Sequence, residues 1–177
     1  IIVAGGLGKR MGAAMPKQFL LLKGRPLLMW TLEAFHGYDA GMPLVLVLSP
    51  DHHDTWKALC ATHAFGLPHT LVAGGAERFH STQEGLKAVT HDGLVAVHDG
   101  VRPLVSAELI TRCFAAAEAH GAAIPVVPIG PSASVPVATA KVGRLSKKKL
   151  SRWSLPIATI TSGRARATPC RAVSKVA

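Results

Sequence analysis

The chain has 177 residues, of which 49% are hydrophobic, and its formal net charge at pH 7 is +10. This length suits one folded domain with a sizeable core, and no apolar run reaches the roughly 18 residues that a membrane-spanning helix needs. The three cysteines form no CxxC pair, which argues against a disulfide framework or a zinc site and favours a reducing, cytoplasmic setting. Because the apolar run begins at Ile1 without a methionine, we expect further residues ahead of it.

The positive charge is distributed unevenly along the chain. Residues 1–130 hold ten Lys/Arg and ten Asp/Glu, whereas residues 131–177 hold ten Lys/Arg and no acid. The body is therefore neutral, and we expect no nucleic-acid partner for it. Nucleic-acid binding through the basic tail stays open as an alternative of another functional class.

The first half of the chain alternates between strand and helix patterns. Residues 1–4 predict a strand, followed by a glycine-rich loop and a helix over 26–35. A continuous apolar run predicts a buried strand over 43–49, and Asp51 is placed to cap a helix over 51–65. Residues 69–75 predict a short strand that ends in a glycine pair.

The alternation continues to about residue 128. Ser81 with Glu84 three residues later predicts a capping box at the start of a helix over 81–90. A strand over 93–99, a capped helix over 106–121 and a strand over 122–128 follow. The pattern predicts an α/β fold, Rossmann-like, with a mainly parallel sheet and helices on both faces.

Ligands of such folds bind at the carboxyl ends of the strands, where this chain has loops at 5–17, 74–81 and 98–103. In the first loop, small residues allow close approach to phosphate, and Arg10 and Lys17 add positive charge. The spacing matches neither GxGxxG nor the Walker sequence. A plain glycine turn is the alternative interpretation.

Three ordered motifs carry a family resemblance. GKRMG…PKQF follows the first strand, VAGGAERFHSTQEGLKAV spans 72–89, and VHDGVRP spans 97–103. Together they resemble the 2-C-methyl-D-erythritol 4-phosphate cytidylyltransferases, which belong to the glycosyltransferase-A-like nucleotidyltransferases. The resemblance runs from residue 1 to about 128 and implies a nucleotide-binding α/β domain there. It also implies transfer of a cytidylyl group from CTP to a sugar-alcohol phosphate, with Mg²⁺ and release of pyrophosphate.

The resemblance assigns roles in the first loop. Arg10 and Lys17 match the family's transition-state stabilisers, and both residue types suit phosphate oxygens. The loop positions that contact base, ribose and phosphates are matched by Ala4, Gly5, Gly6 and Gly8.

The second and third motifs complete the expected site. Gly75 and Ser81 match the cytosine-reading segment, with Arg78 between them at the motif's arginine; Ser81 as a helix cap is the alternative. Asp99 matches the metal-binding acid, as an alternative to a simple turn residue, and Gly100 stands where the family prefers alanine. Arg102 matches an arginine near the acceptor phosphate, with an Arg102–Asp99 pair as the alternative.

Residues 129–177 form an anomalous basic tail without the family's VDR and TPQ segments or its late lysine. Out-of-frame translation is the favoured explanation; a divergent substrate lobe and a genuine basic arm stay open. Because the family binds the acceptor through these missing segments, we expect poor turnover. The family forms a homodimer, which we do not expect of this chain with the same certainty as the fold. Because its apolar residues follow no helix or strand periodicity, the tail is expected to lack order. Ribitol 5-phosphate cytidylyltransferase is the alternative enzyme.

Overall fold

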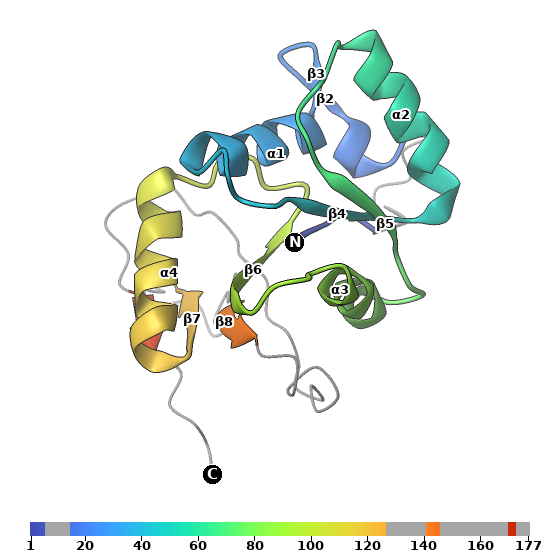
Figure 1. The fold of residues 1–177 in the computed structure, drawn as a ribbon. Helices are drawn as coiled ribbons and strands as arrows, with labels where there is room; N and C mark the ends of the chain where they lie inside the picture. Colours follow the sequence, from blue (N-terminus) through green and yellow to red (C-terminus); the bar gives the residue numbers. More distant parts are fainter. Residues whose placement is uncertain (6–14, 127–140, 146–169, 173–177) are drawn as a thin grey trace, which may run out of the picture. The chain divides into compact units, whose positions relative to one another are not determined.

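The computed structural model describes residues 1–5, 15–126, 141–145 and 170–172 (Figure 1). The chain divides into two compact units. The first comprises Ile1–Thr90 with Asp99–Val105, and the second comprises His91–His98 with the described residues from Ser106 on. Within the described residues, no helix combines the length and apolar character needed to cross a membrane.

The first unit is built on three parallel strands. These are β1 (Ile2–Val3), β4 (Val45–Leu48) and β5 (Thr70–Ala73), in the order β5-β4-β1. Ile2 pairs with Leu46, and Val47 pairs with Val72. All four residues of β4 are buried, as expected for a central strand covered on both faces.

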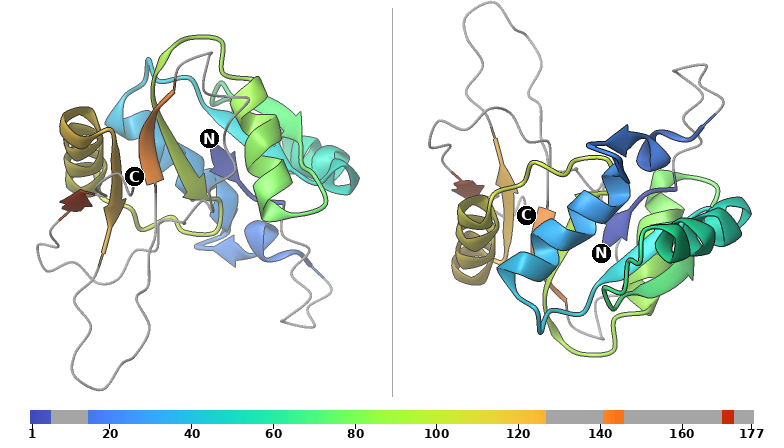
Figure 2. Two further views of the ribbon diagram at one scale, coloured as in Figure 1. Left: turned by 90° about the horizontal axis from the view of Figure 1, so that it is seen from below. Right: turned by 90° about the horizontal axis from the view of Figure 1, so that it is seen from above.

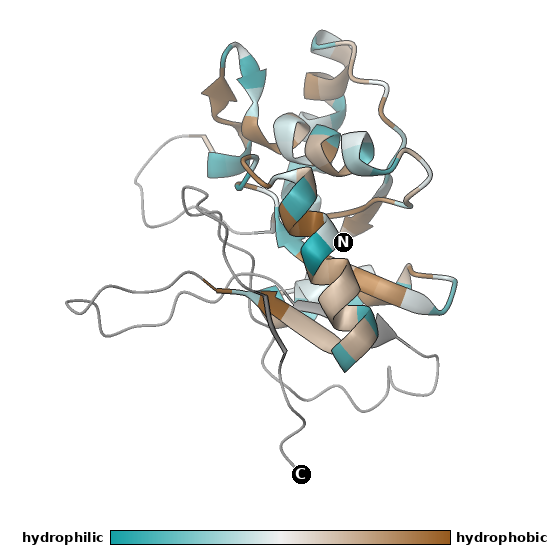
Figure 3. Cartoon of the chain, turned by 90° about the vertical axis from the view of Figure 1, so that its left-hand side faces the viewer, coloured by the Kyte–Doolittle hydropathy of each residue, from teal (hydrophilic) through white to brown (hydrophobic). Residues whose placement is uncertain are grey.

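Helices cover both faces of these strands. Helices α1 (Leu27–Tyr38) and α2 (His53–Thr62) lie on one side and α3 (Arg78–Lys87) on the other (Figures 1 and 2). Leu28 and Leu32 of α1 and Trp56 of α2 are almost fully buried, as is Leu86 of α3. Figure 3 shows hydrophilic and hydrophobic residues mixed along the helices, in line with their amphipathic patterns.

The turn before α2 differs from the prediction. A short 3₁₀ helix, η3 (Pro50–His52), precedes α2, whose N-cap is His52. Asp51 lies inside η3, where its carboxylate accepts a long hydrogen bond of 3.4 Å from the Ser49 hydroxyl. The predicted N-cap at Asp51 is wrong, because Pro50 starts a separate turn first.

A small hairpin follows the first motif and was not predicted. Strands β2 (Leu21–Leu22) and β3 (Arg25–Pro26) pair antiparallel, with Leu22 opposite Arg25. The two connecting residues, Lys23 and Gly24, both have positive φ, at 51° and 77°. Positive φ at both positions is typical of a type I′ turn, which matches the twist of the flanking strands.

The start of α3 also corrects a prediction. The helix begins at Arg78 with Glu77 as its N-cap, so Ser81 lies in its first turn rather than ahead of it. The Ser81–Glu84 capping box is therefore wrong. Glu84 instead forms an ion pair of 2.7 Å with Lys87.

The second unit has antiparallel strands beside one helix. Strand β6 (Gly93–Asp99) pairs with β8 (Lys141–Leu145), β8 with β7 (Ala122–Pro125), and β7 with β9 (Cys170–Ala172). Helix α4 (Ala107–His120) begins at the capping hydroxyl of Ser106 and ends at Gly121, whose φ is 83°. The hydrophobic core of this second unit contains Ala96, Cys113, Ala117 and Ala123.

Strands β8 and β9 lie in the tail expected to lack order. They contribute eight paired residues, so that expectation is wrong for 141–145 and 170–172. The rest of the tail lies outside the described residues. Short stretches such as Lys141–Leu145 carry too few apolar residues for their pattern to predict a strand.

Candidate active site

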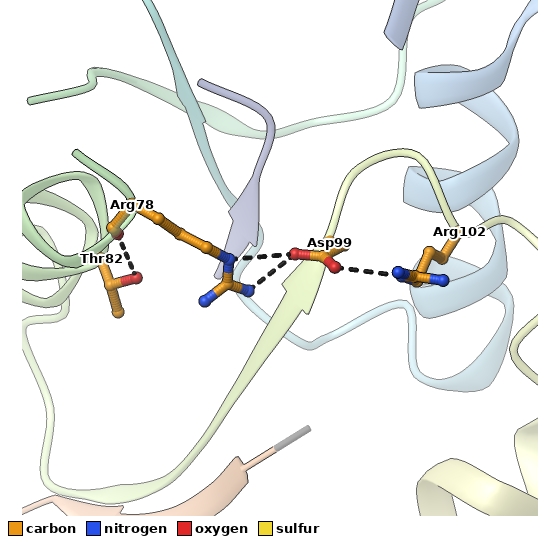
Figure 4. A network of polar contacts seen from close by, with 4 residues as sticks. All are labelled: Arg78, Thr82, Asp99 and Arg102. Carbon is orange, nitrogen blue, oxygen red and sulfur yellow. Dashed lines mark hydrogen bonds and ion pairs between the residues drawn. The ribbon is translucent and has the colours of Figure 1, made fainter. Parts of the chain in front are cut away.

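Asp99 is the centre of the polar network in the first unit (Figure 4). It ends β6, and its side chain is 17% exposed. Its Oδ1 accepts hydrogen bonds from Arg78 Nη2 at 2.7 Å and from Arg78 Nε at 3.3 Å. Its Oδ2 accepts one from Arg102 Nε at 3.0 Å. One carboxylate is therefore shared by two guanidinium groups.

These two arginines come from different elements. Arg78 is the first residue of α3, and its carbonyl accepts a hydrogen bond of 2.9 Å from the Thr82 hydroxyl. Arg102 lies in the turn after β6, where its N–H donates to the Asp99 carbonyl at 3.2 Å. The Arg102–Asp99 pair, one of the two interpretations of Arg102, is present in the structure.

Ser81 forms a second centre with the glycine pair that follows β5. Its hydroxyl oxygen accepts from the N–H of Gly75 at 3.2 Å and lies 3.3 Å from the Gly75 carbonyl, to which the hydroxyl donates. A Cβ at Gly74 would lie 3.1 Å from the same oxygen, and one at Gly5 would lie 3.2 Å from it. The hydroxyl thus bonds to the segment after β5 and lies next to Gly5, which follows β1.

Gly74 is a residue of this site that the sequence reasoning missed. Its N–H donates to the Leu48 carbonyl at 2.6 Å, and a Cβ there would press on that carbonyl at 3.2 Å. The signal was the glycine pair itself, since two glycines in succession after a strand indicate close backbone packing on both.

Gly100 and Ala4 pack directly against each other. A Cβ at Gly100 would lie 2.7 Å from Ala4 Cβ and 2.9 Å from Leu28 Cδ1. Both backbone polar groups of Gly100 are hydrogen-bonded. Its N–H donates to the Val3 carbonyl, and its carbonyl accepts from the Thr31 hydroxyl at 2.8 Å. Thr31 was also missed; its signal was a hydroxyl on the buried face of α1, between Leu28 and Leu32.

Lys17 takes no part in the hydrogen bonds described above for Asp99, Ser81 and Gly100. It opens the 3₁₀ helix η2 (Lys17–Phe19) and is exposed, while Phe19 is buried and packs edge-on against His52 at 5.6 Å between ring centroids. Among the described residues, no hydrogen bond or ion pair joins Lys17 to Asp99. Gly6, Gly8 and Arg10 lie in the segment 6–14, outside the described residues, and their roles stay predictions.

In the part of the chain that the structure describes, the other titratable side chains add no metal-binding cluster. Among the described residues, no group of three His, Cys, Asp or Glu side chains is placed to hold a metal ion. Cys113 is buried, and partial burial raises the pKa of the Cys60 thiol, which makes it less reactive. His69 accepts a hydrogen bond from Trp56 Nε1 at 2.9 Å, a structural role rather than a catalytic one.

Known proteins resemble this chain in sequence. The family model described as IspD, 2-C-methyl-D-erythritol 4-phosphate cytidylyltransferase, matches residues 1–141. The enzyme of that name from Bacteroides thetaiotaomicron is 54% identical over 129 residues, which are 73% of this chain and 59% of that protein. The one from Porphyromonas gingivalis is 55% identical over 130 residues, 73% of this chain and 57% of that protein. The chain thus spans somewhat under three fifths of these relatives.

Solved structures give the same result for the fold. The 2-C-methyl-D-erythritol 4-phosphate cytidylyltransferase of Thermus thermophilus has a TM-score of 0.64 at 25% identity, covering 93% of this chain and 89% of that one. The 4-diphosphocytidyl-2C-methyl-D-erythritol synthase of Anaerococcus prevotii has a TM-score of 0.59 at 26% identity, covering 81% and 67%. The predicted α/β fold class is confirmed. With the family model matching most of its length, the chain belongs to the 2-C-methyl-D-erythritol 4-phosphate cytidylyltransferase family.

Proposed function

We propose that this chain carries the CTP-binding part of a cytidylyltransferase that acts on 2-C-methyl-D-erythritol 4-phosphate. The observation that carries the proposal is the pair of polar centres at Asp99 and Ser81, in a chain of this family. Both centres lie where strands end, which is where α/β folds bind nucleotides. The relatives bear the methylerythritol name, which favours that acceptor over ribitol 5-phosphate.

In the proposed reaction, a phosphate oxygen of the acceptor attacks the α-phosphorus of CTP. A new P–O bond forms as the bond from the α-phosphorus to the bridging oxygen breaks, and pyrophosphate leaves with that electron pair. Such chemistry depends on positioning and on neutralising charge. Arg10 and Lys17 are proposed to stabilise the transition state, while Ala4, Gly5, Gly6 and Gly8 bring the backbone close to the nucleotide.

A magnesium ion is proposed to bind at Asp99 only together with the nucleotide, because both oxygens of Asp99 accept hydrogen bonds from arginines. Mg²⁺ is usually bound through one or two carboxylates together with substrate phosphates, and Asp99 offers one partly buried carboxylate at the end of β6. When bound, the cation would neutralise charge on the triphosphate. Asp99 would hold it there, and Arg102 and Gly100 would set the turn that orients Asp99.

Base recognition is proposed for the second centre. The Ser81 hydroxyl and the backbone of Gly75 present donors and acceptors of the kind that read the edge of a cytosine. Arg78, between them in sequence, is proposed to lie near the triphosphate. A site of paired hydrogen-bonding groups discriminates strongly against a base that lacks the matching groups.

Binding of the acceptor is proposed to be weak in this chain. The segments that grip the acceptor phosphate in the family have no counterpart in the sequence of residues 129–177. We therefore propose slow turnover in a cytoplasmic protein without a nucleic-acid partner.

Two assays test the proposal with the full chain. Thermal shift with CTP, GTP, UTP and ATP in the presence of Mg²⁺ is expected to show the largest stabilisation with CTP. Pyrophosphate release from CTP and 2-C-methyl-D-erythritol 4-phosphate is expected to be slow. Equal shifts with all four nucleotides would contradict CTP binding, and rapid release would contradict the weak acceptor side.

A further inference from the structure

Both carboxylate oxygens of Asp99 already have cationic partners. Figure 4 shows Arg78 approaching from α3 on one side and Arg102 from the turn on the other. Oδ1 accepts two hydrogen bonds from the Arg78 guanidinium, the shorter being 2.7 Å, and Oδ2 accepts one from Arg102 at 3.0 Å. The oxygens that a cation would use are therefore the ones that the arginines occupy.

The local charge works against a free divalent cation. Two guanidinium groups and one carboxylate give this cluster a net charge of +1 before any cation arrives. The Asp99 side chain is only 17% exposed, so water screens these charges less than it would at the surface. The local net charge is different for a cation that binds together with a triphosphate, because the phosphates supply several negative charges.

The two arginines differ in how they are attached. Arg102 lies three residues after Asp99 in one turn, and its N–H is bonded to the Asp99 carbonyl at 3.2 Å. Arg78 comes from another element, 21 residues earlier, and meets Asp99 through its side chain alone. Movement of the Arg78 side chain would free Oδ1 without disturbing the turn that positions Asp99.

We infer that Arg78 is a positioning residue that gates Asp99: it occupies Oδ1 and must release it before that oxygen can bind a divalent cation. Free cation is then bound weakly, and cation arriving with a nucleoside triphosphate is bound well. The inference rests on the proposed function, in which Asp99 is the metal-binding acid. It adds a role for Arg78 that is exerted through Asp99 rather than through the reacting atoms.

The test is titration of the full chain with Mn²⁺ alone, without nucleotide, followed by the electron paramagnetic resonance signal of the free ion. Arg78→Met removes both the donors that occupy Oδ1 and one positive charge, so it is expected to bind Mn²⁺ about tenfold more tightly than the wild type. Arg78→Lys keeps the charge with fewer donors and is expected to be intermediate. Arg112→Met removes a charge of similar exposure from α4 and is expected to match the wild type.

The outcomes separate the inference from the function on which it rests. If Arg78→Met binds Mn²⁺ no better than the wild type, or not at all while folded by circular dichroism, the gate is wrong. Asp99→Asn added to Arg78→Met is expected to abolish the gain. If the gain survives that double substitution, the cation is held elsewhere, which overturns the gate. Loss of Mn²⁺–CTP binding in Asp99→Asn alone would still support the metal-binding role.

Discussion

At the scale of single residues, the candidate site is organised by two side chains with several partners each. The Ser81 hydroxyl bonds to Gly75 and would be crowded by a Cβ at Gly5 or Gly74. The Asp99 carboxylate joins Arg78 to Arg102. In both cases residues that are far apart in the sequence contact the same side chain, which accounts for a glycine or an arginine at those positions.

Ser81→Ala is expected to weaken both folding and CTP binding. The change leaves the Gly75 N–H without its side-chain acceptor, which costs about 1 kcal/mol in free energy of unfolding. Urea denaturation and calorimetric titration with Mg–CTP measure the two effects. Ser106→Ala is the matched control: it removes the N-cap of α4, costs about 1 kcal/mol, and should leave CTP affinity unchanged. Equal CTP affinities in both variants would contradict a role for Ser81 in binding.

Gly100→Ala is expected to destabilise the protein by about 1–3 kcal/mol, because the added methyl group would overpack against Ala4 and Leu28. The second substitution Ala4→Gly removes the nearer of these contacts, at 2.7 Å, and should restore part of the loss. Urea denaturation of the two single variants and the double variant gives the coupling. Strictly additive effects would show that the two positions do not touch.

At the scale of elements, much of the chain could be predicted from its sequence. The strand over 93–99 and the helix over 106–121 have clear signals, because Ser106 and Gly121 mark the helix ends through local chemistry. The start of α3 could not be predicted from Ser81, whose hydroxyl is engaged by Gly75, a tertiary contact invisible to a capping rule. The N-cap predicted at Asp51 is wrong for a different, local reason, because Pro50 begins η3 ahead of α2.

The site was predicted in part. The resemblance selected Arg78, Asp99 and Arg102, which the structure brings together in one network. Patterns along the chain could not predict that Arg78 would occupy Asp99, because this depends on where α3 starts relative to that carboxylate. Arg10 stays a prediction, since segment 6–14 lies outside the described residues.

Two helical glycines give a prediction about how closely helices pack. A Cβ at Gly85 of α3 would lie 2.7 Å from Ile1 Cγ2 and 2.9 Å from Val47 Cγ2, whereas one at Gly37 of α1 would have open space. Gly37→Ala is expected to stabilise the protein by roughly 0.5–1 kcal/mol through helix propensity. Gly85→Ala is expected to lose about 1–3 kcal/mol by overpacking. Urea denaturation that shows stabilisation in both would contradict the close packing of α3.

At the scale of the whole molecule, similarity to the family and the charge pattern change in the same region. The family model matches residues 1–141, and all of the net positive charge lies in residues 131–177. Strands β8 and β9 give part of this region paired structure. Out-of-frame translation nevertheless remains our hypothesis for its composition.

The coding DNA tests that hypothesis directly. Reading the other two frames downstream of codon 129 is expected to recover words that contain VDR and TPQ, because a shifted frame preserves the original nucleotides. Absence of both words from both frames would contradict the hypothesis. A divergent lobe or a genuine basic arm would then account for residues 131–177.

The proposed function requires Lys17 and Asp99 to contact the same metal-bound triphosphate. Calorimetric titration with CTP in Mg²⁺ tests it most directly, using the wild type, Lys17→Met, Asp99→Asn and the surface control Lys57→Met. Each of the two site variants is expected to bind CTP at least about tenfold more weakly, as loss of a charged contact costs roughly 1.5–3 kcal/mol, while Lys57→Met binds normally. Wild-type affinity in both site variants would contradict the account.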